Sequence, residues 1–170
     1  MLFRSDRGQS LLWMGHGHRS SLEAKKFLTR WLDIEVMPLR LVDERFYHLD
    51  TCFCPLEDGY LMYYPQAFDQ FALRAIHAHV PSSHRIVVDE RDALQFACNA
   101  VNGGETIVLN HASRALVATL EARGFEVVQR GLSEFMKAGG AAKCLTLRLD
   151  ERRCEYRTPP MFEMAGEIDW

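Results

Sequence analysis

The sequence of 170 residues lacks three features that would each place it in a common class of protein. No apolar run approaches the roughly 20 residues that a membrane-spanning helix needs. The first ten residues, MLFRSDRGQS, contain no apolar core of a secretory signal. The 20 basic residues are scattered rather than clustered, and the formal net charge is -3, which argues against a nucleic-acid-binding surface. We therefore expect a protein with neither membrane nor nucleic-acid partners.

Cysteine is sparse, and its spacing excludes two familiar uses. The five cysteines are an odd number without a CxxC pair, so the sequence predicts neither a disulfide framework nor a zinc site of paired ligands. We interpret the cysteines as reduced thiols of a cytoplasmic protein. The glycine-rich stretches lack the full pattern and the lysine of a phosphate-binding loop. No organic cofactor is predicted.

The sequence does contain a regular alternation of strand and helix patterns, which is typical of an α/β protein. Strands are predicted at 9–14, 34–42, 85–88, 105–110, 125–130 and 144–149, with a hairpin around 57–59. Helices are predicted after residue 20, at 66–79, at 89–97 and at 113–123. The unit recurs at intervals of roughly 45 residues, which indicates repeated modules. We expect one domain over residues 1–150 and a loosely ordered arm over 151–170.

The segment FYHLDTCFCPL places a histidine and a carboxylate two residues apart. On a strand, His48 and Asp50 would share one face, and Cys52 and Cys54 would continue it. An imidazole beside a carboxylate is a general acid/base arrangement, and a hydrogen-bonded core histidine is the alternative. A metal site made of these residues and the histidines of GHGH is a further alternative. Because i, i+2 spacing on a strand is poor for closing a tetrahedral site, no metal is predicted.

The stretch KAGGAAKCLT leads from a glycine-rich loop to a single cysteine at the start of a predicted strand. Gly139 and Gly140 allow the backbone to approach a ligand closely. Cys144 can therefore face a pocket, where Lys143 beside it would favour the reactive thiolate. Free cysteine is also among the most often buried residue types. The pattern leaves two interpretations for Cys144, a nucleophile or a small core residue.

The segment GHGHRSS joins the first predicted strand to the first helix. Gly15 and Gly17 permit a tight turn, and the N-terminus of the following helix can bind an anion. Arg19 adds a bidentate donor for a carboxylate. A turn with a solvated arginine is the alternative.

In their order along the chain, G-H-G-H-R-S-S, F-Y-H-L-D-T and E-F-M-K-A-G-G-A-A-K-C-L-T resemble segments of the guanidine-modifying superfamily. That superfamily includes arginine deiminases, dimethylarginine dimethylaminohydrolases and amidinotransferases. The similarity covers residues 9–149 and is to the bacterial dimethylargininase-like or amidinotransferase-like branch. It implies a pentein fold, an α/β propeller of ββαβ modules around a central site, of which this chain holds about three of five.

The resemblance also implies roles for four residues. Cys144 would be the nucleophile and His48 the general acid/base, while Asp50 would hold the substrate guanidinium. Arg19 would meet a substrate carboxylate. The implied reaction is thiolate attack on the guanidinium carbon, loss of an amine and a covalent thiouronium intermediate. Water then completes a hydrolase reaction, or an amine completes an amidinotransferase reaction. Arginine, methylated arginine, agmatine and other guanidines stay open as the small-molecule substrate.

The sequence departs from the family pattern in two places. Ala141 stands where the family loop usually has a third glycine. Members usually carry an acidic E-G-x-x-D segment just before the strand that here reads QSLLWM, where this chain has MLFRSDRGQS. With Asp50 alone to grip the cation, we expect a weak or inactive hydrolase, and the alternative is a pentein-like binding or interaction module. An open propeller would expose apolar faces, so we also expect self-association or pairing with a missing N-terminal half.

Overall fold

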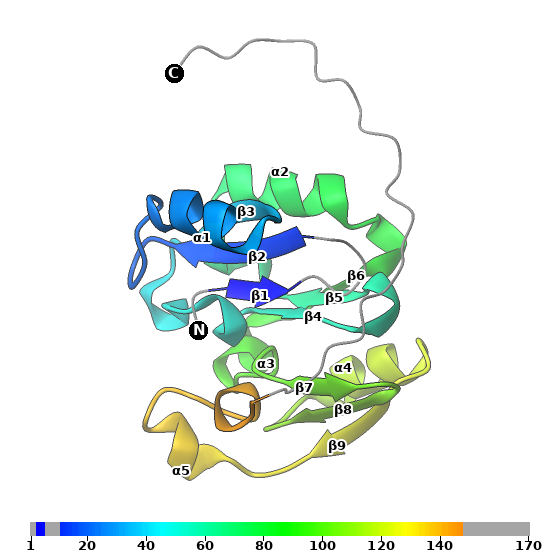
Figure 1. Cartoon of the computed structure of the whole chain (residues 1–170). Helices are drawn as coiled ribbons and strands as arrows, with labels where there is room; N and C mark the ends of the chain where they lie inside the picture. Colours follow the sequence, from blue (N-terminus) through cyan, green and yellow to red (C-terminus); the bar gives the residue numbers. More distant parts are fainter. Residues whose placement is uncertain (1–2, 6–10, 148–170) are drawn as a thin grey trace.

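The computed structural model describes residues 3–5 and 11–147 (Figure 1). Within these residues, three three-stranded sheets follow one another along the chain. Each sheet has the same plan: two antiparallel strands, then a helical connection, then a third strand that joins the second strand in parallel. This is the ββαβ module implied by the family resemblance, repeated three times in the described part of the chain.

The first module contains β1 (Phe3–Ser5), β2 (Leu11–His16), α1 (Ala24–Leu32) and β3 (Glu35–Arg40). The middle strand β2 pairs with β1 on one side and with β3 on the other. Pro38 lies in β3, opposite Met14 of β2. Because β3 is an outer strand of its sheet, the missing N–H of Pro38 is tolerated there.

The second module contains β4 (Phe53–Pro55), β5 (Leu61–Tyr63), α2 (Gln70–His79) and β6 (Arg85–Val87). The predicted hairpin around 57–59 is confirmed, because β4 and β5 pair antiparallel on either side of it. Helix α2 begins later than predicted. The carboxylate of Asp69 accepts a hydrogen bond of 2.7 Å from the backbone N–H of Ala72 and so caps the helix at that point.

The third module contains β7 (Val101–Gly103), β8 (Thr106–Leu109), α4 (Arg114–Glu121) and β9 (Glu126–Gln129). Helix α3 (Glu90–Leu94) connects it to the second module, and α5 (Ser133–Met136) follows it. Strand β7 was not predicted, because its VNG sequence has the composition of a turn. The turn lies at residues 104–105, between β7 and β8, and Gly104 has a positive φ of 59° there.

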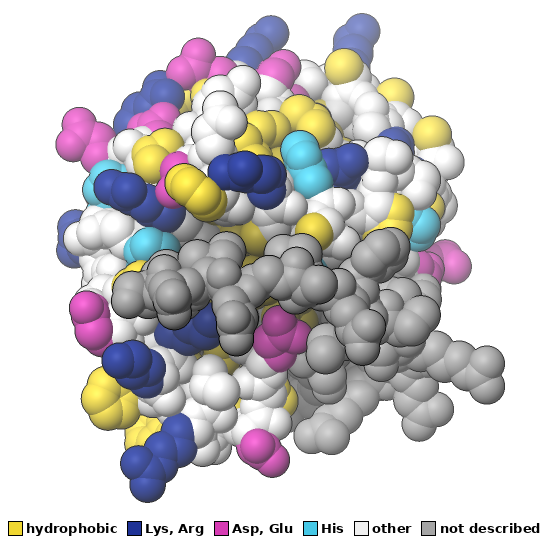
Figure 2. Space-filling model, turned by 90° about the horizontal axis from the view of Figure 1, so that it is seen from above, with side chains coloured by type: hydrophobic (Ala, Val, Ile, Leu, Met, Phe, Trp, Pro, Cys, Tyr) yellow, Lys and Arg dark blue, Asp and Glu magenta, His cyan; other side chains and the backbone are white. Residues whose placement is uncertain are grey.

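One large apolar cluster joins the three modules and forms the core. The fully buried ring of Trp13 from β2 packs against Phe53 from β4, with ring centroids 5.3 Å apart. Helix α1 contributes no buried residue, and the side chains of Phe27 and Trp31 are 72% and 87% exposed. Figure 2 views the molecule from the side on which α1 and α2 lie in Figure 1, and hydrophobic side chains are interspersed there with Lys and Arg.

No helix within residues 3–5 and 11–147 combines the length and the apolar character needed to cross a bilayer. The predicted arm over 151–170 and the end of the strand predicted over 144–149 fall outside the described residues.

Candidate active site

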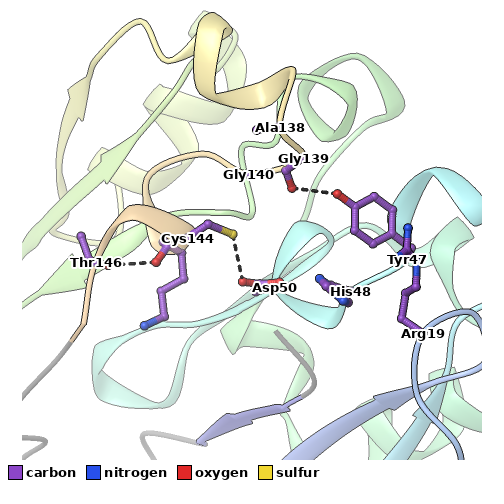
Figure 3. Close-up of a pocket in the computed structure, with 10 residues that line it drawn as sticks. Arg19, Tyr47, His48, Asp50, Ala138, Gly139, Gly140, Cys144 and Thr146 are labelled. Carbon is purple, nitrogen blue, oxygen red and sulfur yellow. Dashed lines mark hydrogen bonds between the residues drawn. The ribbon is translucent and has the colours of Figure 1, made fainter.

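A pocket of about 490 Å³ brings together the four residues singled out in the sequence. Three segments line it: the loop after β2, the loop that precedes β4, and the loop after α5 (Figure 3). The lining residues are Arg19, Tyr47, His48, Asp50, Ala138, Gly139, Gly140, Lys143, Cys144 and Thr146. The pocket therefore joins Arg19 from the first module to a histidine and a carboxylate of the second module and to a cysteine that follows the third.

His48 and Asp50 reach the pocket from a single 3-10 turn, η2 (Leu49–Thr51), and not from a strand. His48 is extended at the start of this turn, and its carbonyl oxygen accepts hydrogen bonds from the backbone N–H of Thr51 at 3.1 Å and from its hydroxyl at 2.7 Å. The prediction that His48 and Asp50 lie on a strand is therefore wrong. The two hydrogen bonds from Thr51 to the carbonyl oxygen of His48 turn the chain before β4 begins.

Cys52 and Cys54 do not continue the face of His48 and Asp50. Both cysteines are fully buried in the apolar core and neither lines the pocket. Within the described residues, no group of three or more His, Cys, Asp or Glu side chains is arranged to hold a metal ion.

Cys144 lies in a short 3-10 turn, η6 (Lys143–Leu145), and not in a strand as predicted. The turn closes through a hydrogen bond of 3.2 Å from the backbone N–H of Thr146 to the carbonyl oxygen of Lys143. It presents the thiol to the pocket, where Sγ donates to Oδ2 of Asp50 at 3.5 Å (Figure 3). Cys144 is exposed, so the interpretation of this residue as a small core residue is excluded.

The two glycines before Cys144 allow the loop to pass close to its neighbours. Gly139 has a φ of +90°, and a Cβ there would overlap the hydroxyl oxygen of Tyr47. A Cβ at Gly140 would lie 2.6 Å from Cβ of Cys144 and 3.0 Å from its sulfur. Ala141, which replaces the family's third glycine, is fully buried. The loop accepts this methyl group and has no room for one at Gly140.

The environment of Cys144 favours the neutral thiol. Cys144 as a whole residue is exposed, but its sulfur packs against the pocket wall, and this desolvation raises the pKa of the thiol. The negative charge of Asp50 and its hydrogen bond with the thiol raise the pKa of Cys144 further. A hydrogen bond from Asn99 opposes both effects. A cation bound beside Asp50 would offset its charge and make the thiolate easier to form.

The pKa of His48 is lowered, whereas that of Cys144 is raised. Desolvation lowers the pKa of its imidazole, and the positive charge of Arg19 lowers it too, while the charge of Asp50 raises it. Because the net direction is downward, the imidazole is mostly neutral at pH 7 and can accept a proton. A neutral imidazole and a protonated thiol that line the same pocket are a base and an acid held in one site.

Arg19 stands at the rim of the pocket, where its guanidinium lies over the ring of Tyr47 at 5.2 Å from the centroid. Gly17 makes this placement possible, since its φ is +128° and a Cβ would lie 2.7 Å from the carbonyl oxygen of Leu41. The tight turn predicted for GHGHRSS is confirmed by the bond of 3.0 Å from the Gly17 N–H to the Ser20 carbonyl.

Sequence reasoning missed two residues of the site, Tyr47 and Asn99. Tyr47 lines the pocket and donates a hydrogen bond to the carbonyl of Gly139. Its position directly before His48 was the only available signal. Asn99 is buried behind the pocket and contacts both Asp50 and Cys144. It lies far from both in the sequence, in a segment that carries no motif.

No family model matches the sequence, but relatives are found among curated proteins. The bifunctional arginine dihydrolase/ornithine cyclodeaminase ArgZ of Synechocystis sp. is 56% identical over 146 residues, which are 86% of this chain and 21% of that protein. The N(G),N(G)-dimethylarginine dimethylaminohydrolase of Mycobacterium tuberculosis is 42% identical over 135 residues, 79% of this chain and 44% of that protein. The chain thus spans about a fifth of the first relative and less than half of the second.

A solved structure gives the same result in three dimensions. The N-terminal domain of ArgZ, covalently bound to a reaction intermediate, superimposes with a TM-score of 0.86 at 54% sequence identity. The match covers 88% of this chain and 55% of that one.

Proposed function

We infer that this chain, which belongs to the guanidine-modifying (pentein) superfamily, is the part of a cysteine-dependent hydrolase that carries the nucleophile. The substrate class we propose is a small molecule with an arginine-like guanidinium group. One observation carries the proposal: Sγ of Cys144 lies 3.5 Å from Oδ2 of Asp50, in a pocket that His48 also lines. Residues 1–150 would form the catalytic unit, of which the described residues provide three modules.

Hydrolysis is favoured over transfer of the amidino group. Both reactions start with the same thiouronium intermediate and differ only in whether water or an amine resolves it. The curated relatives reported above are named as a dihydrolase and a dimethylaminohydrolase. Their names support water as the second reactant.

In the first half of the proposed reaction, Cys144 attacks the guanidinium carbon. The carbon is resonance-stabilised, so the nucleophile must be the thiolate, and a carboxylate must fix the planar cation. Asp50 is placed for that contact because its carboxylate faces the same pocket as the thiol. The cation also cancels the charge that raises the pKa of Cys144. As the thiolate forms, the neutral imidazole of His48 takes the proton of the Cys144 thiol, and it gives this proton to the amine as the carbon–nitrogen bond breaks.

In the second half, water attacks the thiouronium carbon. His48 is neutral after it has given up its proton, and so it can take a proton from this water. The carbon–sulfur bond then breaks, Cys144 leaves as a thiolate, and a ureido product is released. His48 finally returns the proton taken from water to the Cys144 thiolate, which restores the thiol and the neutral imidazole, and the proton lost as the ureido carbonyl forms is taken up by the released amine.

Arg19 favours a substrate that carries a carboxylate. Its guanidinium lies at the pocket rim over the ring of Tyr47 and is exposed to solvent. Arginine fits this arrangement better than agmatine, because agmatine has no carboxylate for the Arg19 fork.

A second candidate function, a binding or interaction module with weak or no turnover, has its own support. Asp50 is the only carboxylate among the described residues that line the pocket. Each charge-assisted hydrogen bond that a second carboxylate would add is worth about 1.5–3 kcal/mol, or roughly tenfold or more in rate.

The test is intact-protein mass spectrometry after brief incubation with arginine, methylated arginine and agmatine, stopped with acid. The proposed function predicts an adduct on the chain that is absent from Cys144→Ser. Arginine should give more adduct than agmatine, and Arg19→Gln should reduce that preference. No adduct with any compound, from folded protein, would instead support the binding module.

We further propose that the chain associates with another copy or with additional modules of its fold, as a cytoplasmic assembly. The exposed Phe27 and Trp31 support this, because they lie four residues apart on one face of α1 and adjoining exposed apolar side chains mark interaction surfaces. Light scattering tests it, and a stable monodisperse monomer would contradict it.

A further inference from the structure

Asn99 connects the two segments that carry the reacting groups. It lies between α3 and β7 and is fully buried. Its side-chain amide makes hydrogen bonds to the turn of Asp50 and to the loop of Cys144, which are far from it in the sequence. Neither the pocket lining nor any motif includes Asn99.

The amide nitrogen of Asn99 faces both partners of the reactive pair. Nδ2 donates to the carbonyl oxygen of Asp50 at 3.1 Å and to Sγ of Cys144 at 3.2 Å. One amide group thus fixes how far the turn of Asp50 lies from the sulfur.

The amide oxygen of Asn99 holds the backbone of the cysteine loop. Oδ1 accepts from the backbone N–H of Ala141 at 2.8 Å and from that of Cys144 at 3.3 Å. A primary amide has two donor hydrogens and two acceptor lone pairs, so these contacts use its full capacity. They also settle the orientation, because the reversed amide would set its NH2 group against two backbone donors.

The main chain of Asn99 is held just as firmly. Its carbonyl accepts from the Lys143 N–H at 3.0 Å, and its N–H donates to the carbonyl of Phe96 at 2.9 Å. Phe96 has a left-handed φ of 55°, which is uncommon for an aromatic residue. A strained backbone conformation of this kind persists only where surrounding contacts hold it in place. The turn at Phe96 positions Asn99 beside the pocket.

We propose that Asn99 is the positioning residue of the nucleophile: it orients Cys144 against Asp50 and stabilises the thiolate through Nδ2. This inference rests on the proposed function of Cys144. Burial and the charge of Asp50 both disfavour the thiolate, and Asn99 supplies the N–H donor that acts against them. The amide thus makes ionisation of Cys144 attainable without placing a positive charge in a pocket that must bind a cation.

The test separates the two roles of Asn99 with two variants. Asn99→Asp keeps the volume and the acceptor for Ala141 but replaces the N–H donor with a carboxylate oxygen. Asn99→Ala removes donor and acceptor together. The matched control is Asn102→Asp, because Asn102 is also buried, and its amide bonds Glu57, Gly104 and Thr106, none of which lines the pocket. The readout is the rate of iodoacetamide alkylation at Cys144 against pH, measured by peptide mass mapping.

Asn99→Asp should move the pH midpoint of alkylation upward and slow the reaction at neutral pH by about tenfold or more. Asn99→Ala should slow it too, and Asn102→Asp should leave it within about twofold. Equal effects at Asn99 and Asn102, or no shift in Asn99→Asp, would overturn the proposal.

A measurement on the unsubstituted chain tests the proposal even if the variants fail to fold. The side-chain amide protons of Asn99 should shift in NMR spectra with the pH midpoint of Cys144 alkylation, while those of Asn102 should not. Absence of that shift would overturn the proposal by itself. Alkylation needs no guanidino substrate, so a positive result here with no guanidino adduct would refute the proposed function and leave the role of Asn99 intact.

Discussion

The hydroxyl of Tyr47 donates a hydrogen bond of 2.9 Å to the carbonyl oxygen of Gly139. This bond joins the segment that begins with His48 to the loop that presents Cys144 (Figure 3). The ring of Tyr47 also lies under the guanidinium of Arg19 and edge-on to His48, with ring centroids 4.9 Å apart. One side chain therefore contacts all three segments of the pocket.

Tyr47→Phe should loosen the cysteine loop and leave the fold intact. The change removes the bond to Gly139 and keeps the ring beneath Arg19. A neutral hydrogen bond contributes about 0.5–1.5 kcal/mol, so hydrogen exchange of the amides at 139–144 should quicken by about two- to tenfold. Tyr60→Phe is the control, because that ring stacks on His84 outside the pocket. The same quickening in both variants would show that Tyr47 has no special hold on the loop.

Gly140→Ala should displace the nucleophile. The added Cβ would lie 2.6 Å from Cβ of Cys144, so the turn that carries Cys144 must shift. We expect adduct formation with guanidino compounds to fall by about tenfold or more, since misplacement of a reacting atom by an ångström is costly. Gly131→Ala is the control, because its Cβ would meet open space. Full adduct formation in Gly140→Ala would mean that the loop can move aside without loss.

Asp50→Asn should change two rates in opposite directions. In the free chain, the charge of Asp50 and its bond with the thiol raise the pKa of Cys144, so their removal lowers that pKa. Alkylation follows the thiolate, which forms as the pH rises through the pKa; at pH 7 it should therefore become about threefold or more faster in Asp50→Asn.

Adduct formation with a guanidino compound should meanwhile be almost lost in Asp50→Asn, because the cation has no carboxylate to bind. Alkylation and adduct measurements on the same protein sample provide the comparison. A loss of both reactions would point to a distorted site, and a gain in both would remove Asp50 from the substrate contact.

Asp92→Asn should lower the free energy of unfolding without altering the pocket. Asp92 is buried, and its carboxylate accepts from the N–H and from the hydroxyl of Ser113, each at 2.7 Å. An amide cannot satisfy both donors, so we expect a loss of about 1–3 kcal/mol in urea unfolding. Asp58→Asn in the exposed hairpin turn is the control, since Asn tolerates its φ of 56°. Equal stability of the two variants would contradict this role of Asp92.

Local patterns in the sequence determined the modules. The apolar run of β2, the hairpin at 57–59 and the start of the helix predicted from residue 113 each depend on a few neighbouring residues, and the structure confirms them. Cys144, His48 and Asp50 were singled out because their motifs resemble those of a known family, and all three line one pocket. Strand β7 was missed because its side chains signal a turn, and only pairing with β8 makes it a strand.

Only the tertiary structure decided how the site is assembled. The 3-10 turn of His48 and Asp50, where the sequence predicted a strand, is closed locally by Thr51, but only the packing of the modules sets this turn against Cys144. Asn99 is hydrogen-bonded to Cys144, 45 positions along the chain, and Tyr47 is hydrogen-bonded to Gly139, 92 positions along the chain. Such contacts leave no periodic or compositional trace in a single sequence, since they exist only once the modules have packed together.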